Sequence, residues 1–158
     1  MNCTRCPFQL CPRLALPVTK QTGGVLFIID TPSSVDTTLG EVCSDFETSA
    51  VMRGLVERAG ISNYYVLPIV RCVPPDLMLE LNRVAVMCCH NDAVDFVHRY
   101  KPSKIFFLGK EVDGFMRSII GKCPVISHPR IIASVGGGIN SPLFRMALRK
   151  VKEVLNEV

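Results

Sequence analysis

Five of the eight cysteines have a spacing that suits a metal site. Cys3 and Cys6 form a C-x-x-C pair near the start of the chain, and Cys72, Cys88 and Cys89 follow later. A C-x-x-C turn supplies two thiolates from one short loop, and a four-coordinate zinc or iron centre needs two more soft ligands from elsewhere in the fold. Cys72 and one of the adjacent pair would supply them. The alternative is that these residues are small buried hydrophobic side chains that bind no metal.

The length of 158 residues predicts one domain, residues 1–158, with the cysteine turn of residues 1–12 joined to it through the metal site. Hydrophobic residues make up 48% of the chain, but no stretch approaches the roughly 18 apolar residues that span a bilayer. The polar N-terminus also lacks the apolar segment of a signal peptide. We therefore expect a monomeric intracellular protein, of the cytoplasm or nucleoid, with no membrane partner and with cysteines that serve metal or thiol chemistry. The net charge of +4 is compatible with a phosphate-bearing partner but does not select one.

Short apolar runs alternate with segments of helical periodicity. The predicted strands are residues 25–29, 64–70, 104–108 and 124–127, and the predicted helices are residues 48–59, 85–99, 112–119 and a last helix with Ser141 as N-cap and Pro142 in its first turn. The run at 25–29 is apolar throughout, which indicates a strand that is buried on both faces. This alternation predicts a three-layer α/β/α sandwich around a mostly parallel central sheet.

A polar loop, residues 30–34, follows the first predicted strand directly. Open α/β sheets bind their ligands at the carboxyl ends of the strands. This loop, which begins with Asp30, is therefore the first candidate for an active site.

Six landmarks of the sequence carry a resemblance to a known family. They are the cysteine turn at 2–6, the strand and loop at 25–33, the helix end at 55–61, the Arg-Cys-Val-Pro-Pro turn at 71–75, the Lys-Pro and Leu-Gly pairs at 101–102 and 108–109, and Ser127-His128-Pro129. In order and approximate spacing they resemble the iron-sulfur, thermophile-type branch of the uracil-DNA glycosylase superfamily. The resemblance covers nearly the whole chain and implies a uracil-DNA glycosylase-like fold.

The resemblance implies a [4Fe-4S] cluster that braces the fold near the DNA surface, with Cys3, Cys6 and Cys72 as three of its ligands. Counting forward from Cys72 favours Cys88 as the fourth ligand, whereas counting back from Lys101 through the helix favours Cys89. Because loops absorb insertions more easily than helices, we expect Cys89, with Cys88 as the alternative. Zinc is the alternative occupant, since thiolates suit both metals.

The resemblance also implies DNA repair by base excision, in which a hydrolase removes uracil or another modified base by cleaving its N-glycosidic bond. Asp30 stands at the place of the family's catalytic-loop glutamate, where it would orient water or stabilise positive charge on the sugar. Its alternative role is to cap its own loop. His128 would donate a hydrogen bond to the departing base, or would only fix the loop before Pro129.

The remaining expected contacts follow from the same alignment. The expected substrate-binding residues are Thr31, Pro32, Ser33, Cys43, Phe46 and Pro68, and the expected DNA-binding residues are Ser127, Arg130, Ile131 and Ile132. Cys43 and Pro68 replace the family's stacking aromatic ring and base-reading asparagine, and a proline side chain offers no hydrogen bond. Arg130 would pair with a phosphate, and the two isoleucines would form an apolar wedge in the duplex.

Three hypotheses follow from these residues. The first is an iron-sulfur DNA-binding protein of this superfamily that excises uracil or another base. The second is a catalytically inactive DNA-binding or protein-docking module in a replication or repair assembly, favoured by the loss of both base-reading positions. The third is a zinc-braced α/β protein that acts on a free nucleotide.

Overall fold

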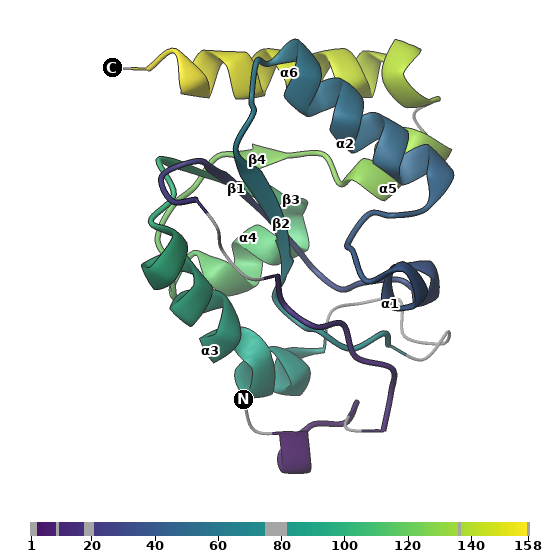
Figure 1. Cartoon of the computed structure of the whole chain (residues 1–158), viewed down its shortest axis with the longest axis vertical. Coiled ribbons are helices and arrows are strands. Elements are labelled where there is room, and N and C mark those ends of the chain that lie inside the picture. Colours follow the sequence, from purple (N-terminus) through teal and green to yellow (C-terminus); the bar gives the residue numbers. More distant parts are fainter. Residues whose placement is uncertain (1–2, 9, 18–20, 75–81, 136, 158) are drawn as a thin grey trace.

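The centre of the molecule is a four-stranded sheet in which every strand is parallel to its neighbours, in the order β2-β1-β3-β4. The computed structural model describes residues 3–8, 10–17, 21–74, 82–135 and 137–157 (Figure 1). The strands are β1 (Val25–Ile29), β2 (Tyr64–Pro68), β3 (Lys104–Leu108) and β4 (Val125–Ile126). The α/β class and the parallel sheet are confirmed for the described residues. Parts of the predicted cysteine turn and Pro75 of the 71–75 turn lie outside them.

Helices cover both faces of the sheet, which gives three layers (Figure 1). One face carries α2 (Phe46–Arg58), α5 (Pro129–Ser134) and α6 (Pro142–Leu155), and the other carries α3 (Arg83–Tyr100) and α4 (Lys110–Met116). Successive side chains of a strand point to opposite faces. In β1, Phe27 therefore packs in the core beneath the first group of helices, and Leu26 and Ile28 pack in the core beneath the second.

Polar side chains cap the N-termini of the three longest helices. Asp45 and Asn82 accept the backbone N–H groups of Thr48 and Ala85 at the starts of α2 and α3, and Ser141 accepts that of Phe144 at the start of α6. The predicted start of the last helix is thus confirmed.

Two short helices replace segments that the sequence analysis had treated as loops. Helix α1 (Ser34–Leu39) begins within the polar loop after β1, and α5 begins directly after His128. Among the described residues, no helix is both long enough and apolar enough to cross a bilayer.

Candidate active site and cysteine cluster

Asp30 and His128 meet at the carboxyl edge of the sheet although they are 98 positions apart in the sequence. Asp30 follows β1 directly, and His128 follows β4 and caps α5. His128 Nε2 lies 2.9 Å from Asp30 Oδ1. His128 Nδ1 accepts the backbone N–H of Arg130 at 3.2 Å, so the ring hydrogen of a neutral His128 sits on Nε2 and is donated to Asp30. The two residues predicted to be catalytic therefore form one hydrogen-bonded pair.

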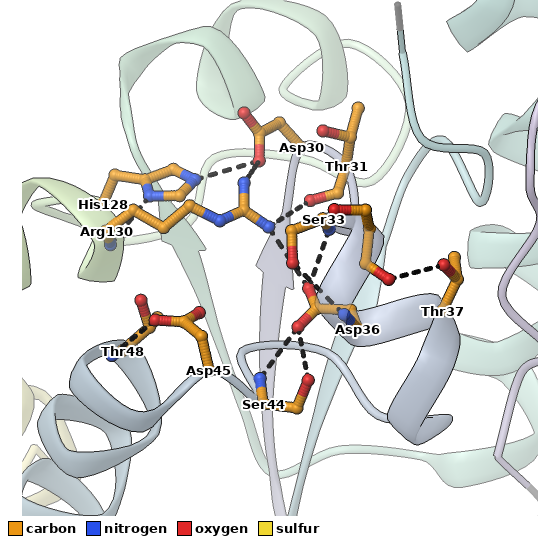
Figure 2. A network of polar contacts seen from close by, with 11 residues as sticks. Asp30, Thr31, Ser33, Asp36, Thr37, Ser44, Asp45, Thr48, His128 and Arg130 are labelled. Atoms are coloured by element: carbon orange, nitrogen blue, oxygen red, sulfur yellow. Dashed lines mark hydrogen bonds and ion pairs between the residues drawn. The ribbon is translucent and has the colours of Figure 1, made fainter. Parts of the chain in front are cut away.

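Arg130 reaches from α5 across this pair into the loop after β1, as Figure 2 shows. Its Nη2 donates to the carbonyl oxygen of Thr31 at 2.7 Å and lies 3.4 Å from Asp36 Oδ2. Its Nη1 lies 3.6 Å from Asp30 Oδ1. Its Nε is buried and has no hydrogen-bond partner among the described residues. The guanidinium thus pairs with two carboxylates in place of the expected phosphate.

Asp36 anchors this arrangement from inside the molecule, where it is fully buried. Its carboxylate accepts the backbone N–H groups of Ser33 and Ser44 and the hydroxyl of Ser44 (Figure 2). Burial alone would raise the pKa of Asp36, but these hydrogen bonds, together with one from the backbone of Cys43, lower it below the ordinary value. The sequence analysis did not identify Asp36. The signal was the Ser33-x-x-Asp36 spacing of a capping box, which the structure contains at the start of α1.

The carboxyl group of Asp30 is ionised at neutral pH. Burial acts to raise the pKa of Asp30, but the hydrogen bond and charge of His128, the backbone N–H of Thr31 and the charge of Arg130 together lower it. A carboxylate with a lowered pKa is a weak proton acceptor and a good partner for positive charge. This electrostatic environment favours stabilisation of a cation or orientation of water over proton abstraction.

The residues predicted to bind substrate do not form one open pocket. Thr31, Pro32, Cys43 and Pro68 are buried, and Pro68 pairs with Ile29 of β1. Burial raises the pKa of the Cys43 thiol to about 12. Phe46, at the start of α2, is 85% exposed and is free to contact a ligand.

Three of the predicted DNA-binding residues line an open cavity, whereas the fourth is buried in the core. Ser127, Arg130 and Ile131 line a cavity beside His128, and Ile131 is 50% exposed. Ile132 is 1% exposed and packs in the core with α2 and α6. Of the two isoleucines expected to form a wedge, only Ile131 therefore reaches the surface.

The cavity beside His128 has a volume of about 1070 Å³ and lies over the carboxyl ends of β3 and β4. Its walls come from the loop after β1, the start of α4, the start of α5 and the start of α6. A second cavity, of about 640 Å³, lies along β2 and is lined in part by Cys43 and Tyr64. Asp30 and His128 border the first cavity and not the second.

The five cysteines singled out in the sequence gather in one region of the fold, here called the cysteine cluster (Cys3, Cys6, Cys72, Cys88 and Cys89). The sulfurs of Cys3 and Cys6 act on the pKa values of Cys72 and Cys88, and those of Cys72 and Cys6 act on Cys89. Burial is the main reason that the pKa values of these three thiols are raised. The cluster thus joins the N-terminal turn, the segment after β2 and the first half of α3.

Two arginines hold the parts of the cysteine cluster together. Arg13 Nη2 donates to Cys3 Sγ at 2.9 Å, and Arg13 also forms an isolated antiparallel bridge with Cys72. Arg71 Nε donates to the carbonyl oxygen of Leu14 at 2.9 Å, and its Nη1 lies 2.8 Å from Asp92 Oδ2 on α3. These contacts explain why three segments distant in sequence converge here.

The cysteine cluster does not form a finished coordination sphere. Within the described ranges, no group of three or more His, Cys, Asp or Glu side chains is arranged to hold a metal ion. The backbone N–H of Phe8 donates to Cys6 Sγ at 3.4 Å, a hydrogen bond of the kind that thiolate ligands accept. The donor set is chemically suited to a thiolate-bound metal, while both Cys88 and Cys89 remain candidates for the fourth ligand.

Comparison with known proteins assigns no family to this arrangement. No family model matches the chain, and no curated protein matches it either. The functional conclusion therefore rests on the residues and geometry described above.

Proposed function

We propose that this chain is an iron-sulfur DNA-binding protein of the uracil-DNA glycosylase superfamily that excises a base by hydrolysing its N-glycosidic bond. The observation that carries the proposal is the Asp30–His128 pair, 2.9 Å apart at the edge of the sheet where parallel α/β folds bind ligands. The resemblance implies a catalytic role for each of these two residues. A cavity opens directly beside them.

The proposed reaction breaks the bond between the sugar carbon C1′ and the base, and the base leaves with the bonding electron pair. A water molecule supplies the oxygen that bonds to C1′ and releases its proton to solvent. Ionised Asp30 orients this water and stabilises positive charge on the sugar. The departing base takes a hydrogen bond from His128 Nε2, which must first turn away from Asp30 because that hydrogen is already donated there.

Cys3, Cys6, Cys72 and Cys89 would hold a [4Fe-4S] cluster, with Cys88 as the alternative fourth ligand and zinc as the alternative metal. The bound metal would brace the N-terminal turn against α3. Its role in this proposal is structural, so the chemistry at Asp30 does not pass through it.

A second candidate function is a catalytically inactive DNA-binding or protein-docking module of a replication or repair assembly. The specific observation in its favour is the position of Arg130, which pairs with Asp30 and is held by Thr31 and Asp36. A carboxylate that is already paired in this way stabilises a reacting sugar less well. The buried Cys43 and Pro68 point in the same direction.

The two candidates are separated by Asp30→Asn in an assay of base release from DNA strands that each carry one uracil, hypoxanthine or alkylated base. For an active enzyme we expect the substitution to lower the rate of release at least about 100-fold while DNA affinity changes by less than about threefold. Asp95→Asn, which removes a carboxylate at an exposed position on α3 outside the cavity lining, serves as the control. Wild-type protein that binds DNA and releases no base would support the inactive module. Protein that binds no DNA would overturn both the enzyme and the DNA-binding form of the module.

A further inference from the structure

The place where the resemblance puts the base does not open onto the Asp30–His128 pair in this chain. That place lies between the loop after β1, Cys43 and the end of β2 at Pro68, and both of these residues are buried. The guanidinium of Arg130 is fixed beside it by Thr31 and Asp36, at 2.7 and 3.4 Å. Asp36 cannot withdraw, because three hydrogen bonds from Ser33 and Ser44 hold its carboxylate. The second cavity is lined in part by Cys43, but not by Asp30, His128 or Pro68. A base bound in the second cavity would therefore touch neither member of the pair.

The larger cavity lies beside His128, over the carboxyl ends of β3 and β4. Its volume of about 1070 Å³ is at the upper end of the range of ordinary ligand sites, about 300–1,000 Å³. Asp30 and His128 border it, so a ligand bound there would reach both members of the pair. Figure 2 shows that Arg130 extends from beside His128, past Asp30, toward Asp36 in the α1 loop network, and Arg130 is also part of the cavity lining.

The lining of this cavity suits a flat, largely apolar ligand. Leu108, Val112 and Ile126 are buried residues of its lining, and Leu143 and Ile131 are its less buried apolar residues. The lining also contains polar and charged residues, which could orient a planar apolar body by its edge. They are Asp30, Lys110, Glu111, Asp113, Ser127, His128 and Arg130.

We infer that the nucleobase of a DNA strand binds in the cavity between His128 and the start of α4, over β3 and β4, and not in the second cavity, beside Cys43. This inference rests on the proposed DNA-binding function and gives it a base-binding site. It explains how the chain can lack both base-reading side chains and still place a base next to Asp30 and His128. Uracil and other bases present a flat apolar face to the apolar part of this lining and ring or carbonyl groups to its polar residues.

The test compares two short DNA strands that carry a fluorescent label. One consists only of abasic units, and the other carries a single base, in turn adenine, cytosine, guanine, thymine or uracil, among abasic units. We expect wild-type protein to bind at least one of the single-base strands about tenfold more tightly than the abasic strand, the size expected for one base in contact with protein. Fluorescence anisotropy gives both dissociation constants.

Leu143→Trp fills the cavity and should remove this tenfold difference while leaving affinity for the abasic strand unchanged. Leu148→Trp is the matched control, because Leu148 is a half-buried leucine of the same helix outside the cavity lining. Val42→Trp fills the second cavity, next to Cys43, and should keep the difference. If Leu143→Trp unfolds the protein, Lys110→Trp narrows the same cavity from an exposed position, and the abasic strand corrects for its lost charge.

The outcomes separate this inference from the proposed function. Equal binding of abasic and single-base strands would overturn the inference and leave DNA binding by the backbone intact. Loss of the difference in Val42→Trp but not in Leu143→Trp would overturn it in favour of the second cavity. Failure to bind any strand would overturn the proposed function itself.

Discussion

The contacts of Arg130 and Asp36 decide what Asp30 can do. Arg130 was expected to pair with a phosphate, but its long side chain pairs with Asp30 and Asp36 at once. An ionised, fully buried carboxylate such as Asp36 is tolerated only when hydrogen bonds and a counter-charge satisfy it. The buried carboxylate of Asp36 therefore depends on the positive charge of Arg130.

We predict that Asp36→Asn lowers the free energy of unfolding by about 2 kcal/mol, because the uncharged amide loses the ion pair with Arg130 and the charge-assisted hydrogen bonds. Urea unfolding at pH 7 measures the change. Asp95→Asn, at an exposed position on α3, should change the free energy by less than about 0.5 kcal/mol. Equal effects at both positions would contradict the role given to Asp36.

The pH dependence of stability has a sign that follows from the lowered pKa values of Asp30 and Asp36. Below the unfolded-state pKa of about 3.9, the unfolded chain binds protons that the folded chain still excludes. Stability supplied by these carboxylates is thus fully present above that pH and is lost as the pH falls through their folded pKa values. We expect the urea concentration at the unfolding midpoint to decrease as the pH is lowered below about 4. This decrease should be less steep in Asp36→Asn. An unchanged slope in the variant would count against the assignment.

At the scale of elements, the start of β1 is held against α3 and the loop before β2. The backbone N–H of Gly23 donates to the carbonyl oxygen of Tyr100 at 3.0 Å, and the Tyr100 hydroxyl donates to Asn63 Oδ1 at 3.0 Å. A Cβ atom on Gly24 would collide with the Asn63 carbonyl oxygen and the Tyr100 hydroxyl. Only glycine leaves room for this three-way contact.

We predict that Gly24→Ala lowers the free energy of unfolding by about 1–3 kcal/mol, because backbone must shift to admit the methyl group. Gly114→Ala is the opposite case: Gly114 lies within α4, and nothing is close to its added Cβ. That substitution should raise stability by about 0.5–1 kcal/mol through helix propensity. Thermal unfolding of both variants checks the pair, and a stable Gly24→Ala protein would contradict the packing described.

Elements with a long periodic pattern were predictable, whereas the contacts of the candidate site were not. The apolar run at 25–29 and the Ser141-Pro142 start of α6 matched the structure, because burial and capping act locally. Helices α1 and α5 were missed, since each has six residues and too short a pattern for periodicity to reveal. The Asp30–His128 contact could be expected only from the order of the strands. The Arg130–Asp36 contact depends on side-chain reach, which no sequence pattern encodes.

At the scale of the whole molecule, both candidate sites lie beyond the carboxyl ends of the strands. Asp30 follows β1, His128 follows β4, and Cys72 comes shortly after β2. The cysteine cluster therefore lies on the same edge of the sheet as the Asp30–His128 pair. This arrangement explains how a structural metal could brace a binding surface without entering the chemistry.

We predict that anaerobically purified protein shows a broad absorption band near about 400 nm and close to four irons per chain, as expected for a thiolate-bound [4Fe-4S] cluster. Cys72→Ala and Cys89→Ala should each lose the metal. Cys123→Ala, at a half-buried position outside the cysteine cluster, should keep it. If Cys88→Ala loses the metal and Cys89→Ala keeps it, the fourth ligand is Cys88 and not Cys89. A colourless protein with one zinc per chain would show that the cysteine cluster binds zinc and not an iron-sulfur cluster. The absence of metal from every preparation would contradict the proposed metal site.

The distribution of these residues along the chain sets an order for assembly during synthesis. All five members of the cysteine cluster lie within the first 89 residues, whereas β3 begins at Lys104 and His128 and Arg130 come later still. When Cys89 leaves the ribosome, β1 can pair with β2, but its other edge has no partner until β3 emerges. The nascent chain therefore passes through a stage in which the sulfurs have been made and His128 and Arg130 of the candidate active site have not. A metal loaded at that stage would fix the N-terminal turn on α3 and shorten the search that the later strands must make.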